Sequence, residues 1–288
     1  MISFDEVKKV VGHRFPGGTV TIEPWRAWLL NDVILSPKMP DGIAHPIWAY
    51  MAGMAGQGVS IPELFDLMHA TAADGPMLGE FALEWREPLR VGATYNVRGG
   101  ITGVDRKTGR RAGTFDIQTY TVEILDGDRL VAVSTNSLVY PRGGGEGGAS
   151  GGPAPMAVEE KRPNALPEFV VESVSAAHMK TMAALLVDPN PIHWDTEETK
   201  RLGLGDQPVN QGPVSISYVL NMLMGWAGGP ERLRSFRVRC LANAYGNDRL
   251  RAGGEAIGER DGGTECHVFL KRADGVGILD GSALIDSR

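Results

Sequence analysis

The sequence has few cysteines, no long apolar run and no excess of positive charge, and each absence removes a class of protein. Cys240 and Cys266 are the only two cysteines in 288 residues, so nothing indicates a secreted scaffold held by disulfides. No uninterrupted apolar run approaches the roughly 18 residues that a membrane span requires. The formal net charge of -6 argues against a nucleic-acid binder that acts through bulk positive charge.

The N-terminus, MISFDEVKKVVGHRF, lacks the apolar core and the small-residue cleavage site of a secretory signal. With 42% hydrophobic and 22% charged residues, the composition is typical of a soluble globular protein. We therefore expect a cytoplasmic protein with reduced thiols. The sequence contains no P-loop, and it predicts no nucleotide cofactor.

A stretch rich in glycine and proline divides the chain into two parts of similar length. Residues 141–164 read PRGGGEGGASGGPAPMAVEEKRPN, a composition that offers little side-chain packing and predicts a flexible linker. The linker separates residues 1–140 from residues 165–288. The total length allows two domains of ordinary size.

The two parts show the same order of predicted elements, an apolar helix followed by a run of strands. In the first part a helix opens at residues 45–51, a second short helix covers 62–70, and strands are predicted over residues 81–85, 94–102, 112–124 and 130–140. In the second part a helix covers residues 213–226, and strands are predicted over residues 235–242, 251–259, 264–271 and 275–285. The pattern predicts a duplicated α+β architecture in which each helix packs on an antiparallel sheet.

The most informative stretch is Asp188-Pro-Asn-Pro-Ile-His193. Its two prolines fix the backbone and disfavour helix at the residues before them, so we expect an extended or turn conformation. Such a rigid turn holds an acid near a base, as general acid–base catalysis requires. The alternative is a purely structural turn, because Asp and Asn beside Pro are common turn formers.

This hexapeptide, read as Asp-x-Asn-Pro-(Ile/Leu/Val)-His, resembles the signature of the (R)-specific enoyl-CoA hydratases, also called MaoC-like dehydratases. Residues 204–212, LGDQPVNQG, and the apolar run that follows resemble the Pro-(Ile/Val)-x-His-Gly element that opens the central helix in that family. The resemblance covers roughly residues 165 to 285. It implies a double hot-dog fold in which residues 1–140 form a non-catalytic repeat that accommodates the substrate, and residues 165–288 form the catalytic repeat.

The resemblance also implies a reaction, the reversible hydration of a trans-2-enoyl-CoA to the (R)-3-hydroxyacyl-CoA. In this interpretation Asp188 takes the proton of the water, and His193 orients that water and serves the proton transfer. The backbone N–H of Gly212, at a helix start, would stabilise the thioester oxyanion. Without the motif, Gly212 is equally well explained as a residue that permits an unusual φ before a proline.

Three further residues are expected close to the pair. Asn190 is expected to fix the turn through bonds from its side chain to the backbone. Ser217 is expected to hydrogen-bond the Asp188 carboxylate, with a solvent-facing or helix-packing role as the alternative. Gln211 stands where the family usually has His, and we expect it to influence how the thioester arm or the acyl chain is held.

Two other chemistries are weighed against this site. Asp188, His193 and Asp195 have no further His or Cys at ligand spacing, so the sequence predicts no metal. Four arginines form a basic strip: Arg232, Arg234, Arg237 and Arg239. This strip either binds the phosphates of coenzyme A or is a solvated face.

Two other functions remain open on the same fold, an acyl-CoA thioesterase and a non-catalytic acyl-thioester-binding partner. The expected ligand is an acyl-CoA thioester, with an acyl-carrier-protein thioester as a second form. Coenzyme A enters as part of the substrate, and no separate cofactor is predicted. By resemblance we expect a homodimer, since hot-dog proteins generally assemble by extending their sheets.

Overall fold

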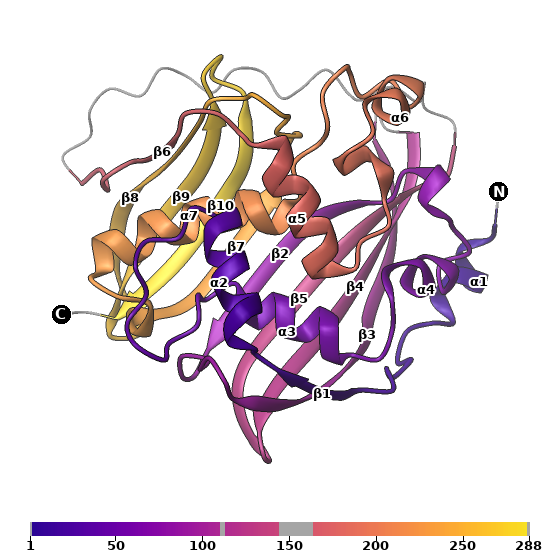
Figure 1. Ribbon diagram of the computed structural model, residues 1–288. Helices are drawn as coiled ribbons and strands as arrows, with labels where there is room; N and C mark the ends of the chain where they lie inside the picture. Colours follow the sequence, from indigo (N-terminus) through magenta and orange to yellow (C-terminus); the bar gives the residue numbers. More distant parts are fainter. Residues whose placement is uncertain (1, 110–112, 144–163, 287–288) are drawn as a thin grey trace.

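The computed structural model describes residues 2–109, 113–143 and 164–286. In this part of the chain, ten strands form one antiparallel sheet in the order β1-β3-β4-β5-β2-β7-β10-β9-β8-β6. Figure 1 shows this sheet curving behind a layer of helices. Of the predicted linker, residues 144–163 lie outside the described residues, and its boundaries stay a prediction. None of the described helices has both the length and the apolar character needed to cross a membrane.

The first half of the chain supplies one side of the sheet and four helices over it. These elements are α1 (Phe4–Lys8), β1 (Gly18–Thr21), α2 (Pro24–Val33), α3 (Trp48–Gly56), α4 (Ile61–Asp66), the 3-10 turn η1 (Ala72–Asp74), β2 (Met77–Trp85), β3 (Thr94–Gly109), β4 (Gly113–Asp126) and β5 (Arg129–Pro141).

The second half supplies the other side. Its elements are β6 (Phe169–Val171), α5 (Ala176–Leu186), η2 (Pro191–His193), α6 (Thr196–Arg201), α7 (Gly212–Ala227), η3 (Pro230–Arg232), β7 (Leu233–Cys240), β8 (Leu250–Arg260), β9 (Gly263–Arg272) and β10 (Gly277–Asp286). All eight strands expected from the sequence are present. The sequence did not predict the strands β1 and β6 or the helices α1, α2 and α5. Strands β1 and β6 have only four and three residues, too few to show alternation.

The sheet is duplicated about its central pair of strands. Outward from that pair, β2, β5, β4, β3 and β1 of the first half match β7, β10, β9, β8 and β6 of the second. Strands β2 and β7 pair antiparallel, with Glu80 opposite Arg239 and Glu84 opposite Ser235. An ion pair between Glu80 and Arg237 also crosses this seam. The predicted duplication is confirmed, and the two repeats share one sheet.

Each repeat places one helix in the concave face of its own strands. Helix α3 contacts β1 to β5, and α7 contacts β6 to β10 (Figure 1). Almost every residue of α7 is buried, which explains why its sequence is apolar on all sides. Gly228 ends this helix in the left-handed region, with φ of 89°. The helix begins at Gly212, with Pro213 second, one residue earlier than the sequence predicts.

A buried ionic cluster joins strands β3 and β4 of the first repeat. Asp116 on β4 is fully buried and accepts hydrogen bonds from Arg106 Nε at 2.6 Å and Nη2 at 2.9 Å. Arg142 Nε donates to the same carboxylate at 2.6 Å. Burial alone would raise the pKa of Asp116, but the two guanidinium groups lower it below its ordinary value.

Asp116→Asn is expected to lower the free energy of unfolding by about 3 kcal/mol at pH 7, because it leaves two arginines without their buried anion. The lowered pKa of Asp116 means that its stabilisation is present above its unfolded pKa of about 3.9. This stabilisation is lost as pH falls through the lower pKa of the folded state. Denaturant unfolding between pH 7 and pH 2 should therefore show a steeper fall in the free energy of unfolding for the wild type than for Asp116→Asn. Exposed Asp105, on neighbouring β3, provides the control Asp105→Asn.

Candidate active site

The Asp188–His193 motif forms the connection between α5 and α6. Val187 ends α5 in the left-handed region, with φ of 53°, and turns the chain away from the helix axis. The Asn190 N–H donates to Asp188 Oδ1 at 3.0 Å, and the Ile192 N–H donates to Asn190 Oδ1 at 3.3 Å. Ile192 belongs to a single 3-10 turn, η2. Asn190 therefore fixes the turn from its side chain to the backbone, as predicted.

The turn brings the acid and the imidazole together. His193 Nε2 lies 3.3 Å from Asp188 Oδ2, and both side chains are 11% exposed. The other ring nitrogen, Nδ1, lies 2.6 Å from the carbonyl oxygen of Val209. A carbonyl oxygen only accepts, so Nδ1 carries the hydrogen and fixes the tautomer. When the imidazole is neutral, Nε2 presents a lone pair beside the carboxylate, where a proton can be exchanged.

Gly212 is joined to this pair by the segment that contains Val209. The Val209 N–H donates to Ile192 O at 2.8 Å, while its carbonyl accepts from His193. Gly212 follows three residues later as the first residue of α7, so its N–H is among the amides that have no carbonyl partner within the helix. An unpaired N–H at the positive end of a long helix suits a developing oxyanion.

The structure gives a steric reason for glycine at this position. A Cβ atom on residue 212 would lie 2.8 Å from Leu78 Cδ2, a side chain of β2 in the first repeat. Gly212 does not have a positive φ. The interpretation that glycine permits an unusual φ here was therefore wrong, and close packing of the other repeat takes its place.

Two of the other predicted neighbours have different partners from those expected. Ser217 is fully buried and donates its hydroxyl hydrogen to Pro213 O at 2.7 Å. This bond uses the single hydrogen of the hydroxyl, and the Asp188 carboxylate has no hydrogen to donate in return. The predicted hydrogen bond between Ser217 and Asp188 was therefore wrong, and so was the solvent-facing alternative. Gln211 is 1% exposed and donates from Nε2 to Met179 O of α5 at 2.8 Å. Its expected influence on the thioester arm stays a prediction.

The alternative residues weighed from the sequence have structural partners. Asp195 caps α6, since its Oδ1 accepts from the N–H groups of Glu197 and Glu198 at 2.9 and 3.4 Å. Arg234 and Arg237 of the basic strip pair with Asp286 and Glu80 respectively. In the described ranges, no three His, Cys, Asp or Glu side chains are grouped to hold a metal ion.

The first repeat contributes a wall to the site, and sequence reasoning did not identify the residues that form it. A pocket of about 150 Å³ beside the acid is lined by Ile61, Pro62, Phe65, Asp66, Thr71, Ala72, Asp188, Pro189 and Asn190. The lining is mostly apolar and combines α4 and η1 with the Asp188–His193 motif. Burial raises the pKa of Tyr50 on α3 well above its ordinary value, and the charges of Tyr120 and Asp188 add to the rise. No local pattern places these residues near position 188.

The duplication identifies the matching position in the first repeat. The short bridge between Val209 and Tyr245 corresponds to the bridge between Ile43 and Arg90. The N–H groups that follow, on residues 210 and 44, donate to the carbonyls of residues 244 and 89. Counting onward, His45 corresponds to Gln211, and Pro46 corresponds to Gly212.

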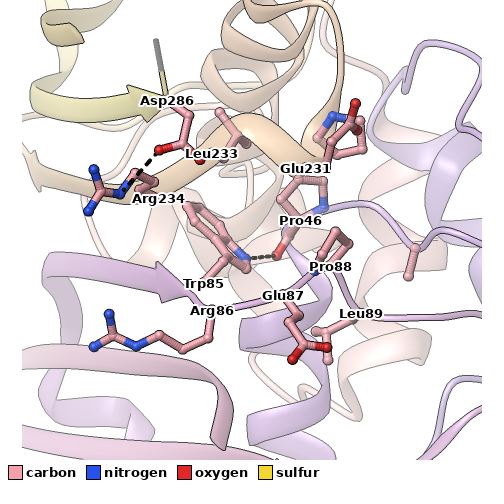
Figure 2. A pocket seen from close by; sticks show the side chains of 12 residues that line it. Pro46, Trp85, Arg86, Glu87, Pro88, Leu89, Glu231, Leu233, Arg234 and Asp286 are labelled. Atoms are coloured by element: carbon pink, nitrogen blue, oxygen red, sulfur yellow. Dashed lines mark hydrogen bonds and ion pairs between the residues drawn. The ribbon is translucent and has the colours of Figure 1, made fainter. Parts of the chain in front are cut away.

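The acid is also replaced in the first repeat. Leu35 ends α2 with the same φ of 53° as Val187 at the end of α5. Ser36 therefore stands where the second repeat has Asp188. The pocket beside Pro46 has a volume of about 200 Å³. Figure 2 shows this pocket and the hydrogen bond that Trp85 Nε1 donates to Pro46 O, which is 3.2 Å long. A proline has no N–H, so the first repeat has neither the acid nor the backbone donor at the positions that correspond to Asp188 and Gly212.

Comparisons with known proteins agree with this architecture. The family model described as MaoC like domain matches residues 159–273. A MaoC-like dehydratase from Phytophthora capsici is 18% identical with a TM-score of 0.73, and the match covers 100% of this chain and 98% of that one. Curated protein sequences give no match.

Two further solved structures bear on the fold. A conserved hypothetical protein of Mycobacterium tuberculosis with a double hot-dog fold is 17% identical, with a TM-score of 0.59 and coverage of 94% of each chain. An acyl-ACP thioesterase from Bacteroides thetaiotaomicron is 12% identical, with a TM-score of 0.54 and coverage of 93% of this chain and 96% of that chain. At these identities the structural matches show the fold. The chain therefore has a double hot-dog fold, and its residues 159–273 are similar to the MaoC like domain.

Proposed function

We propose that this protein reversibly hydrates a trans-2-enoyl thioester to the (R)-3-hydroxyacyl thioester. The observation that carries the proposal is the largely buried pair of Asp188 and His193, 3.3 Å apart, which hydrogen bonds link to Val209, three residues before the free amide of Gly212. An acid–base pair and an oxyanion donor are the groups that this addition requires. The (R) product and the preference for coenzyme A follow from the family resemblance.

The proposed reaction assigns one task to each group. Asp188 removes a proton from water as the water oxygen bonds to C3 of the enoyl group. Electrons move from the C2–C3 double bond toward the thioester oxygen, where the Gly212 N–H stabilises the negative charge. The proton that Asp188 took up then passes to C2 as the carbonyl re-forms, which restores the carboxylate, with His193 orienting the water and serving the transfer. Dehydration follows the same steps in reverse.

The apolar pocket beside Asp188 supports an acyl rather than a polar substrate. Its wall comes from α4 and η1 of the first repeat, which lacks its own acid and its own backbone donor. We infer that the first repeat shapes the substrate site and carries no second centre of this kind. The carrier of the acyl group, the homodimer and the cytoplasmic location stay predictions.

His193→Gln is expected to lower kcat for crotonyl-CoA hydration by about 10² to 10⁴-fold, because glutamine cannot accept and return a proton. The loss of enoyl absorbance measures the rate, and longer or bulkier enoyl-CoAs extend the substrate range. The matched control is His267→Gln, which breaks another histidine–aspartate pair, 2.8 Å from Asp280 on neighbouring strand β10. Wild-type turnover by His193→Gln would remove His193 from the mechanism.

A thioesterase is the second candidate, since an acyl-ACP thioesterase shares the fold. A thiol-trapping dye separates the two reactions, because hydrolysis releases a free thiol and hydration does not. Binding of an acyl thioester in calorimetry, with no turnover in either assay, would identify a non-catalytic binder instead.

A further inference from the structure

The three residues before α7 each hold a different part of the proposed site. Val209 binds the η2 turn through both its N–H and its carbonyl. Asn210 donates from its backbone to Ala244 O at 2.8 Å and from its side chain to Ser215 Oγ at 3.0 Å. Gln211 donates to Met179 O of α5 at 2.8 Å. All three are at least nine-tenths buried, so these bonds are shielded from water.

The bond of Gln211 bears on the acid, because α5 leads directly into Asp188. The Asp188 N–H donates to Ala183 O at 2.9 Å, so the acid is anchored to the last turn of that helix. Near the same end, Arg26 of the first repeat donates to Leu185 O at 3.1 Å. The buried face of α5 also packs on α2 and α3. The Gln211 bond, almost two turns away from Leu185, adds a hydrogen bond that holds the other end of α5 to the start of α7.

The first repeat has a comparable link at the corresponding position. Buried His45 accepts from the Ile47 N–H at Nδ1 and bonds Asn221 Oδ1 of α7 through Nε2 at 3.0 Å. Asn221 in turn donates to Ile34 O and Leu35 O at the end of α2. Burial lowers the pKa of His45 to about 4, so the ring is neutral at ordinary pH. Both repeats therefore link the start of a central helix to the helix that precedes it, the second directly through the Gln211 amide and the first through His45 and then Asn221 of α7.

We propose that Gln211 is a positioning residue whose side-chain amide fixes Asp188 relative to His193 and Gly212. The inference rests on the proposed function. Gln211 Oε1 is buried without a hydrogen-bond partner among the described residues, so the Nε2 donor sets the orientation of the amide. The residue acts through the backbone of α5 and does not touch the reacting atoms.

The test compares Gln211→Met with Gln57→Met. Gln57 is also fully buried, donates from Nε2 to Val59 O at 3.0 Å and has an unpaired Oε1, but lies at the end of α3. We expect Gln211→Met to lower kcat at least about tenfold, because small displacements of a reacting group are costly. KM should stay within about twofold, since the Gly212 amide and the apolar pocket remain. Gln57→Met should keep the wild-type kcat, although its loss of thermal stability should be similar to that of Gln211→Met.

A charged variant adds a readout that packing alone does not change. In Gln211→Glu, the protonated carboxyl can donate to Met179 O, whereas the carboxylate cannot. The kcat of Gln211→Glu relative to wild type, measured at each pH from 8 to 5, should therefore rise as pH falls. A constant ratio contradicts the positioning role.

Crystal structures of wild type and Gln211→Met give a result that does not depend on turnover. The expected result is a displaced Asp188, with its separation from His193 lengthened beyond 3.3 Å. An unchanged separation, or a kcat within twofold of wild type, overturns the inference. If wild type turns over no enoyl thioester, the proposed function fails, and the two crystal structures still decide whether Gln211 positions Asp188.

Discussion

Asp188→Asn is expected to reduce kcat for enoyl-CoA hydration by at least about 10³-fold while the protein keeps its fold. The amide oxygen of asparagine can still accept from the Asn190 N–H, so the turn is preserved. The amide cannot take a proton from water, and the group opposite His193 Nε2 loses its negative charge. Both losses fall on the transition state, so kcat should change far more than KM.

Loss of enoyl absorbance, followed with crotonyl-CoA and longer enoyl-CoAs, measures this effect. Asp195→Asn is the matched control in the same segment, because asparagine also caps helices well and α6 should be retained. Circular dichroism and the unfolding midpoint establish that both variants fold. A rate for Asp188→Asn close to that of Asp195→Asn would exclude Asp188 as the base.

Gly212→Pro is the second variant with a large expected effect, a fall in kcat of about 10² to 10³-fold. Proline removes one backbone N–H, and loss of one oxyanion donor typically has this magnitude. Residue 212 is helical and Gln211 before it is extended, with φ of -63° and ψ of 140°, so proline fits position 212 and the residue before it. Pro213 disfavours a helical residue with a Cβ at position 212, and this strain is shared by Gly212→Ala. The first repeat already has Pro46 at the corresponding position.

Gly212→Ala separates the donor from the packing. Alanine and proline both place a Cβ against Leu78 Cδ2, at 2.8 Å before any shift, but alanine keeps the N–H. The ratio of kcat between the two variants therefore measures the hydrogen bond. Equal rates for Gly212→Ala and Gly212→Pro would show that packing against Leu78, and not the amide, matters at this position.

Local sequence was sufficient for the turn and for most of the elements. Two prolines and the side chains of Asp188 and Asn190 determine the backbone of the motif through bonds between near neighbours. The long strands and α7 were recognisable because alternation and apolar runs are local signals. The same reasoning failed at Ser217, whose hydroxyl bonds the carbonyl four residues earlier, a common alternative within helices.

Contacts between the repeats lie beyond local reasoning. Leu78 and Gly212 are far apart in the chain, and only the pairing of β2 with β7 brings them together. The wall formed by α4 depends on the same arrangement. A helix near residue 62 can be predicted from Pro62, but its position beside Asp188 follows from the whole sheet. The partner of Gln211 on α5 is a tertiary contact of the same kind.

The contact of Leu78 with Gly212 has an evolutionary consequence. The first repeat lacks the acid and the backbone N–H donor that the second repeat has. It nevertheless supplies the surface against which the start of α7 is packed, so a change of volume at position 78 is felt at position 212. The first repeat should therefore vary freely at its rim but remain constrained along the seam, and substitutions at positions 78 and 212 should be selected as a pair.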